Sequence, residues 1–142
     1  MSILDKLDFK ELNLIARYVE VIQAVPGEII FKEGDKGDSL CLVAEGLVDV
    51  FKTSEAGEEI LLSTVSRGRP IGEMAVIDNS VRSATVKAQT KATLLTLSRE
   101  NFDSLLEEHC QVGSKILKGI SRFLSLNMRQ TSSKLADQLH TN

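Results

Sequence analysis

Between Glu20 and Leu97 the sequence follows a period of two, and glycines interrupt it at short intervals. These glycines are Gly27, Gly34, Gly37, Gly46, Gly57, Gly68 and Gly72. A period of two is that of a strand with one buried face, and glycine gives the backbone the freedom that tight turns need. The stretch therefore predicts an antiparallel sandwich or barrel rather than parallel strands joined by helices.

Short strands are expected between these turns, because apolar and β-branched residues gather there. They cover residues 29–32, 39–44, 47–52, 59–65, 84–88 and 93–97. The turn at residues 33–38 is rich in residues that tolerate a left-handed backbone, which suits a tight reversal. No chemistry is evident in that turn alone.

Helical segments are expected on both sides of the strands. In residues 1–19, Asp8 and Glu11 have the spacing of a capping box, which predicts a short helix packed on the core. Its apolar residues at helix spacing are Phe9, Leu12, Ile15, Ala16 and Val19. In residues 98–142, Ser98 is a candidate N-cap for a helix over 99–108, followed by a longer helix over about 111–139. The apolar residues of the longer helix form more than one stripe, with a weak heptad seam.

Composition fits one soluble domain of residues 1–142, because 42% of the residues are apolar and 26% are charged. The net charge of −3 gives no general attraction to nucleic acid or to an anionic membrane. No apolar run is long enough to cross a bilayer and no secretory signal is evident, so a cytoplasmic protein is expected. Cys41 and Cys110 lie far apart and predict buried reduced thiols rather than a disulfide framework.

The stretch at residues 71–86 combines a glycine, a helix-prone turn, a loop and an arginine that enters a strand. Gly72 lets the backbone approach a ligand closely, and the turn after it begins with N–H groups that lack partners within a helix. Such groups attract anions, and Arg82 adds a planar charged fork suited to phosphate oxygens. Glu73 can only accept hydrogen bonds, as a sugar hydroxyl requires. Together these features predict a nucleotide site.

The same stretch resembles the phosphate-binding cassette of cyclic nucleotide-binding domains. The matching residues are Gly72, Glu73, Met74, Ala75, Val76, Ile77, Arg82, Ser83, Ala84, Thr85 and Val86. Ile71 replaces a commoner aromatic residue or leucine, and Val81 stands where many members have proline. Residues 26–39 also resemble the opening of the family's β-roll, and residues 45–50 continue it.

The resemblance implies a mainly β fold with flanking helices. Residues 20–97 would form an antiparallel β-roll or jelly-roll (a double-stranded β-helix), with an N-terminal helix before it and a long C-terminal helix after it. The similarity extends to the cAMP-binding domains of catabolite activator protein and of protein kinase A regulatory subunits. A ligand, cAMP or cGMP, is therefore expected to bind without turnover, with no further cofactor.

The resemblance also assigns roles to individual residues. The cyclic phosphate would contact the turn at 73–75, Arg82 and Ser83, and Glu73 would take the ribose 2′-OH. In the catabolite activator branch a Thr-Ser pair on the long helix contacts adenine, and the serine reaches the partner's ligand. The pair Thr131-Ser132 stands at the corresponding place, which favours cAMP in a homodimer. The implied ligand-binding residues are Gly72, Glu73, Met74, Ala75, Arg82, Ser83, Thr131 and Ser132.

What receives the signal is left open by the resemblance. Transcription factors of this family add a helix-turn-helix domain after the long helix, and no room for one is evident here, so direct DNA binding is not expected. A free-standing sensor, a piece of a larger regulator and a channel or kinase regulatory segment are alternatives, each with an unknown downstream protein. The main competing class is a member that has lost its ligand and serves as a structural dimerisation module.

Enzymatic readings find no support in the residue inventory. The histidines, His109 and His140, lie outside the expected strands, so no metal-ligand set assembles on a barrel. No serine or cysteine has a recognisable base and orienting acid in any motif, and the phosphate-binding loop of triphosphate hydrolases is absent. A binding role is the expectation.

Overall fold

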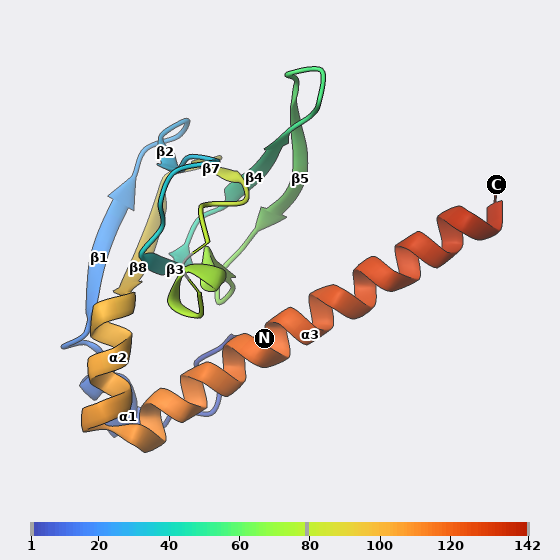
Figure 1. The fold of residues 1–142 in the computed structure, drawn as a ribbon. Coiled ribbons are helices and arrows are strands. Elements are labelled where there is room, and N and C mark those ends of the chain that lie inside the picture. Colours follow the sequence, from blue (N-terminus) through green and yellow to red (C-terminus); the bar gives the residue numbers. More distant parts are fainter. Residues whose placement is uncertain (1, 79, 142) are drawn as a thin grey trace.

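Two antiparallel four-stranded sheets form a β-roll, with helices before and after it (Figure 1). The computed structural model describes residues 2–78 and 80–141. Met1, Asn142 and Asn79, which falls in the expected cassette, lie outside the described residues, as does the side chain of His140. The strand orders are β1-β8-β3-β6 and β2-β7-β4-β5. The strands are β1 Val19–Ala24, β2 Ile29–Phe31, β3 Ser39–Glu45, β4 Val48–Thr53, β5 Glu59–Val65, β6 Pro70–Ile71, β7 Thr85–Ala88 and β8 Ala92–Ser98. The fold class expected from the sequence is confirmed.

The core has two parts because the first sheet is covered on both faces. Between the two sheets lies a cluster whose fully buried centre includes Val43, Val48 and Leu94. On the other face, Leu40 and Leu97 pack against the helices in a second cluster. Residues two apart on one strand point to the same face, so β8 serves both clusters with alternate side chains.

Gly46 shows why glycines punctuate the roll. It joins β3 to β4 with a φ of 86°, a backbone conformation that other residues rarely adopt. A Cβ atom at this position would also collide with the backbone carbonyl oxygen of Lys91. The turn therefore requires glycine both for its conformation and for its close packing.

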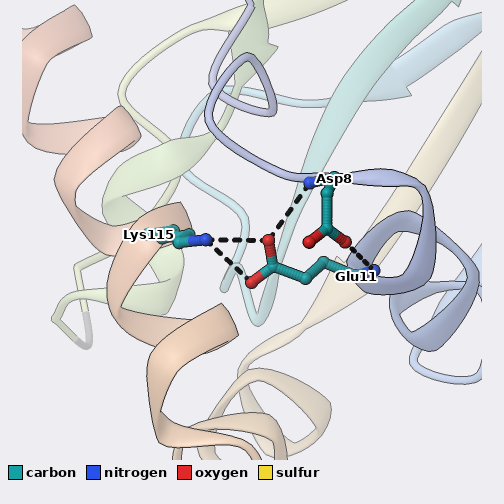
Figure 2. A network of polar contacts seen from close by, with 3 residues as sticks. All are labelled: Asp8, Glu11 and Lys115. Carbon is teal, nitrogen blue, oxygen red and sulfur yellow. Dashed lines mark hydrogen bonds and ion pairs between the residues drawn. The ribbon is translucent and has the colours of Figure 1, made fainter.

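The N-terminal helix α1 spans Phe9–Ile15 and has the expected capping box. The Asp8 side chain accepts from the Glu11 N–H at 2.9 Å, and the Glu11 carboxylate accepts from the Asp8 N–H at 3.1 Å. Figure 2 shows that Glu11 also receives the Lys115 ammonium, at 2.7 Å. Hydrogen bonds from Lys115 and Asp8 lower the pKa of Glu11. The network fastens α1 to the C-terminal helix.

The expected apolar face of this first helix was wrong in part. The helix ends at Ile15, and Val19 begins β1 instead. Ile15 is buried, but Phe9 is 78% exposed and Leu12 is also exposed. A single helix of seven residues can bury only one narrow stripe, so the repeat of apolar residues overstated its contact with the core.

The C-terminal helices are α2, Arg99–Glu108, and α3, Cys110–Thr141. The Ser98 side chain caps α2 by accepting from the Asn101 N–H at 3.0 Å, as expected. The first turns of α3 are buried through Val112, Ile116 and Ile120. From residue 128 to residue 139 every position is exposed. Figure 1 shows this half of α3 running out beyond the sheets.

Two strands were not among those expected. The six-residue β1 carries mostly exposed side chains and pairs with β8 along its whole length, from Val19 opposite Leu97 to Ala24 opposite Ala92. The two-residue β6 begins with Pro70 and pairs with β3. Both are held by backbone pairing with a distant strand, which side-chain periodicity does not report. None of the helices in the described ranges has the length and apolarity that a membrane crossing requires.

Candidate ligand-binding site

A cavity of about 380 Å³ lies where the second sheet, the cassette and α3 meet. Its apolar wall includes Phe31, Val50, Val65 and Val86. Residues 71–75 and 80–84 of the expected cassette also line the cavity. The full lining is Phe31, Val50, Ser63, Val65, Pro70, Ile71, Gly72, Glu73, Met74, Ala75, Ser80, Val81, Arg82, Ser83, Ala84, Val86, Phe123 and Asn127. An apolar cavity with a few polar groups is the usual form of a small-molecule site.

Arg82 is the cationic side chain of this cavity, and it is only 9% exposed. Its guanidinium carbon lies 3.6 Å from the centre of the Phe31 ring. Its Nη1 donates to the Gly72 carbonyl at 3.4 Å and its Nη2 to the Ser39 hydroxyl at 3.3 Å. Among the described residues no carboxylate forms an ion pair with it. Burial lowers the pKa of Arg82, but arginine stays charged in proteins. A buried cation without an ion-paired carboxylate favours an incoming anion.

Two glycines make room for this arginine. A Cβ atom at Gly37 would lie 2.5 Å from Arg82 Nε, and one at Gly72 would lie 2.5 Å from Arg82 Nη1. Gly72 also has a φ of 69°, in the left-handed region. Any larger residue at either position would displace the guanidinium. Gly72 was expected from the sequence, while Gly37 and Phe31 were missed because they are distant from Arg82 in the chain.

Glu73 lines the cavity at the start of a 3₁₀ turn, η1, which spans Glu73–Val76. Burial raises the pKa of its carboxyl, and a hydrogen bond from its own backbone N–H partly opposes this. Met74 and Ala75 also line the cavity, and the Ala75 N–H donates to the Gly72 carbonyl at 3.2 Å. The turn thus places one carboxylate and the backbone of three residues beside Arg82.

Ser83 lies exposed at the mouth of the cavity, where β4 holds its backbone. The Lys52 ammonium donates to the Ser83 carbonyl at 2.7 Å. Lys52 in turn lies 3.6 Å from the Glu33 carboxylate, which accepts from the Thr53 N–H at 2.9 Å. That backbone hydrogen bond is the main reason why the pKa of Glu33 is lowered. Two separate segments, β4 and the turn at Glu33, therefore fix this part of the cassette.

Arg99, the first residue of α2, was missed by the sequence analysis. Its Nε donates to the Ala75 carbonyl at 2.7 Å, and its Nη2 donates to the carbonyls of Asp78 at 2.9 Å and Gly37 at 3.2 Å. A signal for it existed in the sequence. A positive charge in the first turn of a helix is unfavourable for the helix dipole, so an arginine directly after the N-cap Ser98 needs another role.

The expected base contacts lie apart from the cavity within one chain. Thr131 and Ser132 are exposed on the outer half of α3, and Thr131 Oγ1 donates to the Asn127 carbonyl at 2.9 Å. Phe123 and Asn127, two turns and one turn before Thr131, line the cavity instead. Positions four apart share a helix face, so Thr131 lies on the same face of α3 as Phe123 and Asn127. Contact of Thr131 or Ser132 with a ligand stays a prediction.

Metal chemistry has no donor set within residues 2–78 and 80–141, where no group of three His, Cys, Asp or Glu side chains could hold an ion. Both cysteines were expected to be buried, which was wrong for Cys110, because it is exposed at the start of α3. Cys41 is buried with its Sγ 3.3 Å from the Thr96 hydroxyl, and burial raises the pKa of its thiol. The thiol is therefore held in its neutral form. The polar groups of the cavity are suited to holding an anion and a hydroxyl.

Comparison with known proteins agrees with this arrangement. The cyclic AMP receptor protein of Thermus thermophilus is 36% identical over 97 residues, which are 68% of this chain and 45% of that protein. This chain thus spans less than half of that relative. A solved cyclic nucleotide-binding domain from Methylobacillus flagellatus has a TM-score of 0.87 at 27% identity, covering 96% of this chain and 80% of that one.

A second solved structure is the regulatory subunit of a cAMP-independent protein kinase A from Trypanosoma brucei. It has a TM-score of 0.75 at 26% identity, covering 94% of this chain and 47% of that one. The family model described as the cyclic nucleotide-binding domain matches residues 21–109, which include both sheets almost entirely and the whole cassette. The chain therefore belongs to the cyclic nucleotide-binding domain family.

Proposed function

We propose that this chain is a non-catalytic sensor that binds a cyclic nucleotide, with cAMP as the favoured ligand. The observation that carries the proposal is Arg82, a buried guanidinium that rests on Phe31 and lines a 380 Å³ cavity without an ion-paired carboxylate among the described residues. The negatively charged cyclic phosphate would supply the missing counter-charge. Removing water from the pair would strengthen the attraction.

The phosphate would contact groups on both sides of Gly72. The Arg82 fork would bind two of its oxygens, and the N–H groups of Glu73 and Met74 would donate from the η1 turn, because the expected third donor, the Ala75 N–H, is already bonded to the Gly72 carbonyl. Ser83 would donate through its hydroxyl or its backbone N–H. The left-handed conformation of Gly72 supports this role, because it turns the chain sharply into η1.

Glu73 would accept the ribose 2′-OH. Its carboxylate lines the same cavity as Arg82, and it can bond to a hydroxyl when it is ionised. Burial raises its pKa, so the carboxylate is poorly solvated and a hydroxyl donor would replace the hydrogen bonds that water does not supply.

The base would lie toward α3, where Phe123 and Asn127 line the cavity. The Asn127 amide can both donate and accept, so it can bond to either adenine or guanine. Thr131 and Ser132 would add hydrogen bonds to the base in a homodimer, with one subunit's helix reaching the other's ligand. The exposed apolar residues of the outer α3, which include Met128 and Leu135, support such a dimer.

Signalling would use the same helix. A ligand shifts a conformational equilibrium only through its different affinities for the two states. Phe123 and Asn127 would contact the ligand from α3, while the outer half of α3 would contact a second subunit, so binding and dimer geometry would be coupled. The proposed location is the cytoplasm, with which the unpaired thiols of Cys41 and Cys110 are compatible.

The competing proposal is a dimerisation module that has lost its ligand. The exposed outer half of α3 favours it, since that feature does not depend on a nucleotide. The cAMP-independent kinase regulatory subunit of Trypanosoma brucei is a structural relative whose name fits this class. Such a module would dimerise and leave the cavity without a nucleotide.

Titration calorimetry of the purified chain with cAMP, cGMP and 5′-AMP separates these proposals. A sensor is expected to bind one cyclic nucleotide per chain. It should bind 5′-AMP much more weakly, because the open phosphate of 5′-AMP is a dianion, whereas the site is suited to a cyclic phosphate with one negative charge. Absence of heat with both cyclic nucleotides, from a chain that light scattering shows to be dimeric, would support the module that has lost its ligand.

A further inference from the structure

We propose that Arg99 is a positioning residue that ties the cassette to the C-terminal helices and carries the movement of a bound phosphate to α2. The proposal rests on the proposed function for its ligand-dependent part. Its structural part concerns the free protein and can be tested without a nucleotide. Arg99 does not line the cavity, so it is not assigned a contact with the ligand.

First, Arg99 is hydrogen-bonded to the backbone of the cassette. Its guanidinium bonds to the carbonyl of Ala75, inside η1, and to that of Asp78, just after it. These two carbonyls lie at opposite ends of one backbone turn. A planar fork with several donors can bridge them, whereas a single ammonium cannot hold both in one fixed geometry. Arg99 therefore fixes the turn that carries Glu73.

The second step joins this grip to Arg82. Gly37 has no side chain, and the Arg82 guanidinium fills the space where a Cβ atom of residue 37 would lie. The Gly37 carbonyl accepts from Arg99 Nη2 at 3.2 Å. The segment at Gly37 thus lies between the two arginines and touches both. A shift of Arg82 on phosphate binding would displace the backbone of Gly37, which is packed against it.

The third step leads into the helices. The Arg99 N–H donates to the Asp38 carbonyl at 2.7 Å, so the start of α2 is bonded to the same segment through backbone as well as side chain. Farther along α2, Leu106 packs against Gly113 of α3, where a Cβ atom would lie 3.0 Å from the Leu106 Cα. A displacement at the start of α2 is passed to α3 through this close contact.

The test compares Arg99→Met, which keeps length and removes every donor, with Arg99→Lys, which keeps the charge. Arg67→Met serves as the matched control, because Arg67 is exposed and lies outside the cavity lining. Hydrogen exchange is followed in the cassette and in the first turns of α3, with and without saturating cAMP. Calorimetry gives the affinity of each variant for cAMP.

Without nucleotide, cassette amides in Arg99→Met are expected to exchange roughly tenfold faster than in the wild type, since hydrogen bonds from a charged donor are lost. Arg67→Met should match the wild type. Unchanged cassette exchange in Arg99→Met would overturn the positioning role, whether or not the chain binds a nucleotide.

With nucleotide, the wild type is expected to change its exchange in the first turns of α3, and Arg99→Met is expected to lose that change. Its affinity for cAMP should fall by less than about tenfold, as only indirect contacts are removed. Arg99→Lys should also lose the α3 response, and full recovery with lysine would refute the bridging geometry. If the wild type binds no cyclic nucleotide, the proposed function fails and the coupling fails with it, while the exchange of the free protein still decides the positioning role.

Discussion

The guanidinium carbon of Arg82 lies 3.6 Å from the centre of the Phe31 ring, so this buried cation rests on an aromatic face instead of a carboxylate. An aromatic face stabilises a cation without neutralising it. Arg82 consequently keeps its charge available for an anion that enters the cavity. The predictions below follow from this arrangement and from the groups around it.

Phe31→Leu is expected to weaken cAMP binding by roughly tenfold, because the lost cation–π contact allows Arg82 to leave its productive position. Calorimetry measures the change. Phe51→Leu is the matched control, since Phe51 lies under Lys87 at 5.0 Å in a similar contact and does not line the cavity. Equal affinities for the two variants would show that the stacking does not position Arg82.

Gly37→Ala is expected to impair ligand binding more than folding. Its φ is not in the left-handed region, so the added Cβ atom acts mainly by pushing Arg82 aside. Gly34→Ala should impair folding more than ligand binding, because Gly34 has a φ of 89° and open space where the Cβ atom would lie. That substitution should cost about 1 kcal/mol of stability through backbone strain and leave affinity intact. Thermal melts and calorimetry on both variants check this; a loss of affinity in both variants alike would contradict it.

Glu73→Gln is expected to raise the melting temperature of the free protein at neutral pH. Burial raises the pKa of Glu73, so its contribution to the stability of the wild type is greatest below the ordinary glutamate pKa and is lost as the pH rises through the raised pKa of the folded state. Glutamine carries no charge to bury. The increase in melting temperature of Glu73→Gln over the wild type should therefore be complete above the raised pKa and disappear below the ordinary glutamate pKa of about 4.3.

Melting temperatures of Glu73→Gln and the wild type, measured between about pH 4 and about pH 8, should become equal at the lowest pH, which lies below the ordinary glutamate pKa. The same variant should bind cAMP more weakly, because an amide is a poorer acceptor for the ribose hydroxyl than a carboxylate. A constant offset between the two curves at every pH would contradict the assigned cause.

Met128→Glu combined with Leu135→Glu is expected to yield a monomer by light scattering. The two apolar residues are exposed and lie seven positions apart, the spacing of a helix–helix seam. The exposed outer half of α3 would be only marginally stable as a helix in water without a partner. Gln130→Glu adds a charge off this seam and should leave the mass unchanged. A monomeric wild type would contradict the proposed dimer.

The parts of the fold that the sequence predicted are those with local signals. The turns are marked by glycines, and the cassette lies within one short stretch, so Gly72, Glu73 and Arg82 were expected to lie close together, and all three line one cavity. The capping residues Asp8 and Ser98 were equally visible, because a cap is recognised from its neighbours in sequence.

The parts that were missed depend on contacts between distant segments. Phe31 and Gly37 meet Arg82 only after β2 pairs with β7 and the turn that follows folds over the cassette. Arg99 reaches back more than twenty residues to Ala75. The position of α3 relative to the cavity is also set by packing, which is why Phe123 and Asn127 line it rather than Thr131 and Ser132.

The central claim is that Arg82 is kept buried for an anionic ligand, and calorimetric titration of cAMP into the wild type and into Arg82→Leu tests it most directly. We predict that the wild type binds and that the variant binds at least about a hundredfold more weakly, the loss expected when a charge-assisted pair is removed. The variant should melt at or above the wild-type temperature, because an apolar side chain replaces a buried charge without a counter-charge. Equal affinity of the two proteins for cAMP would contradict the account.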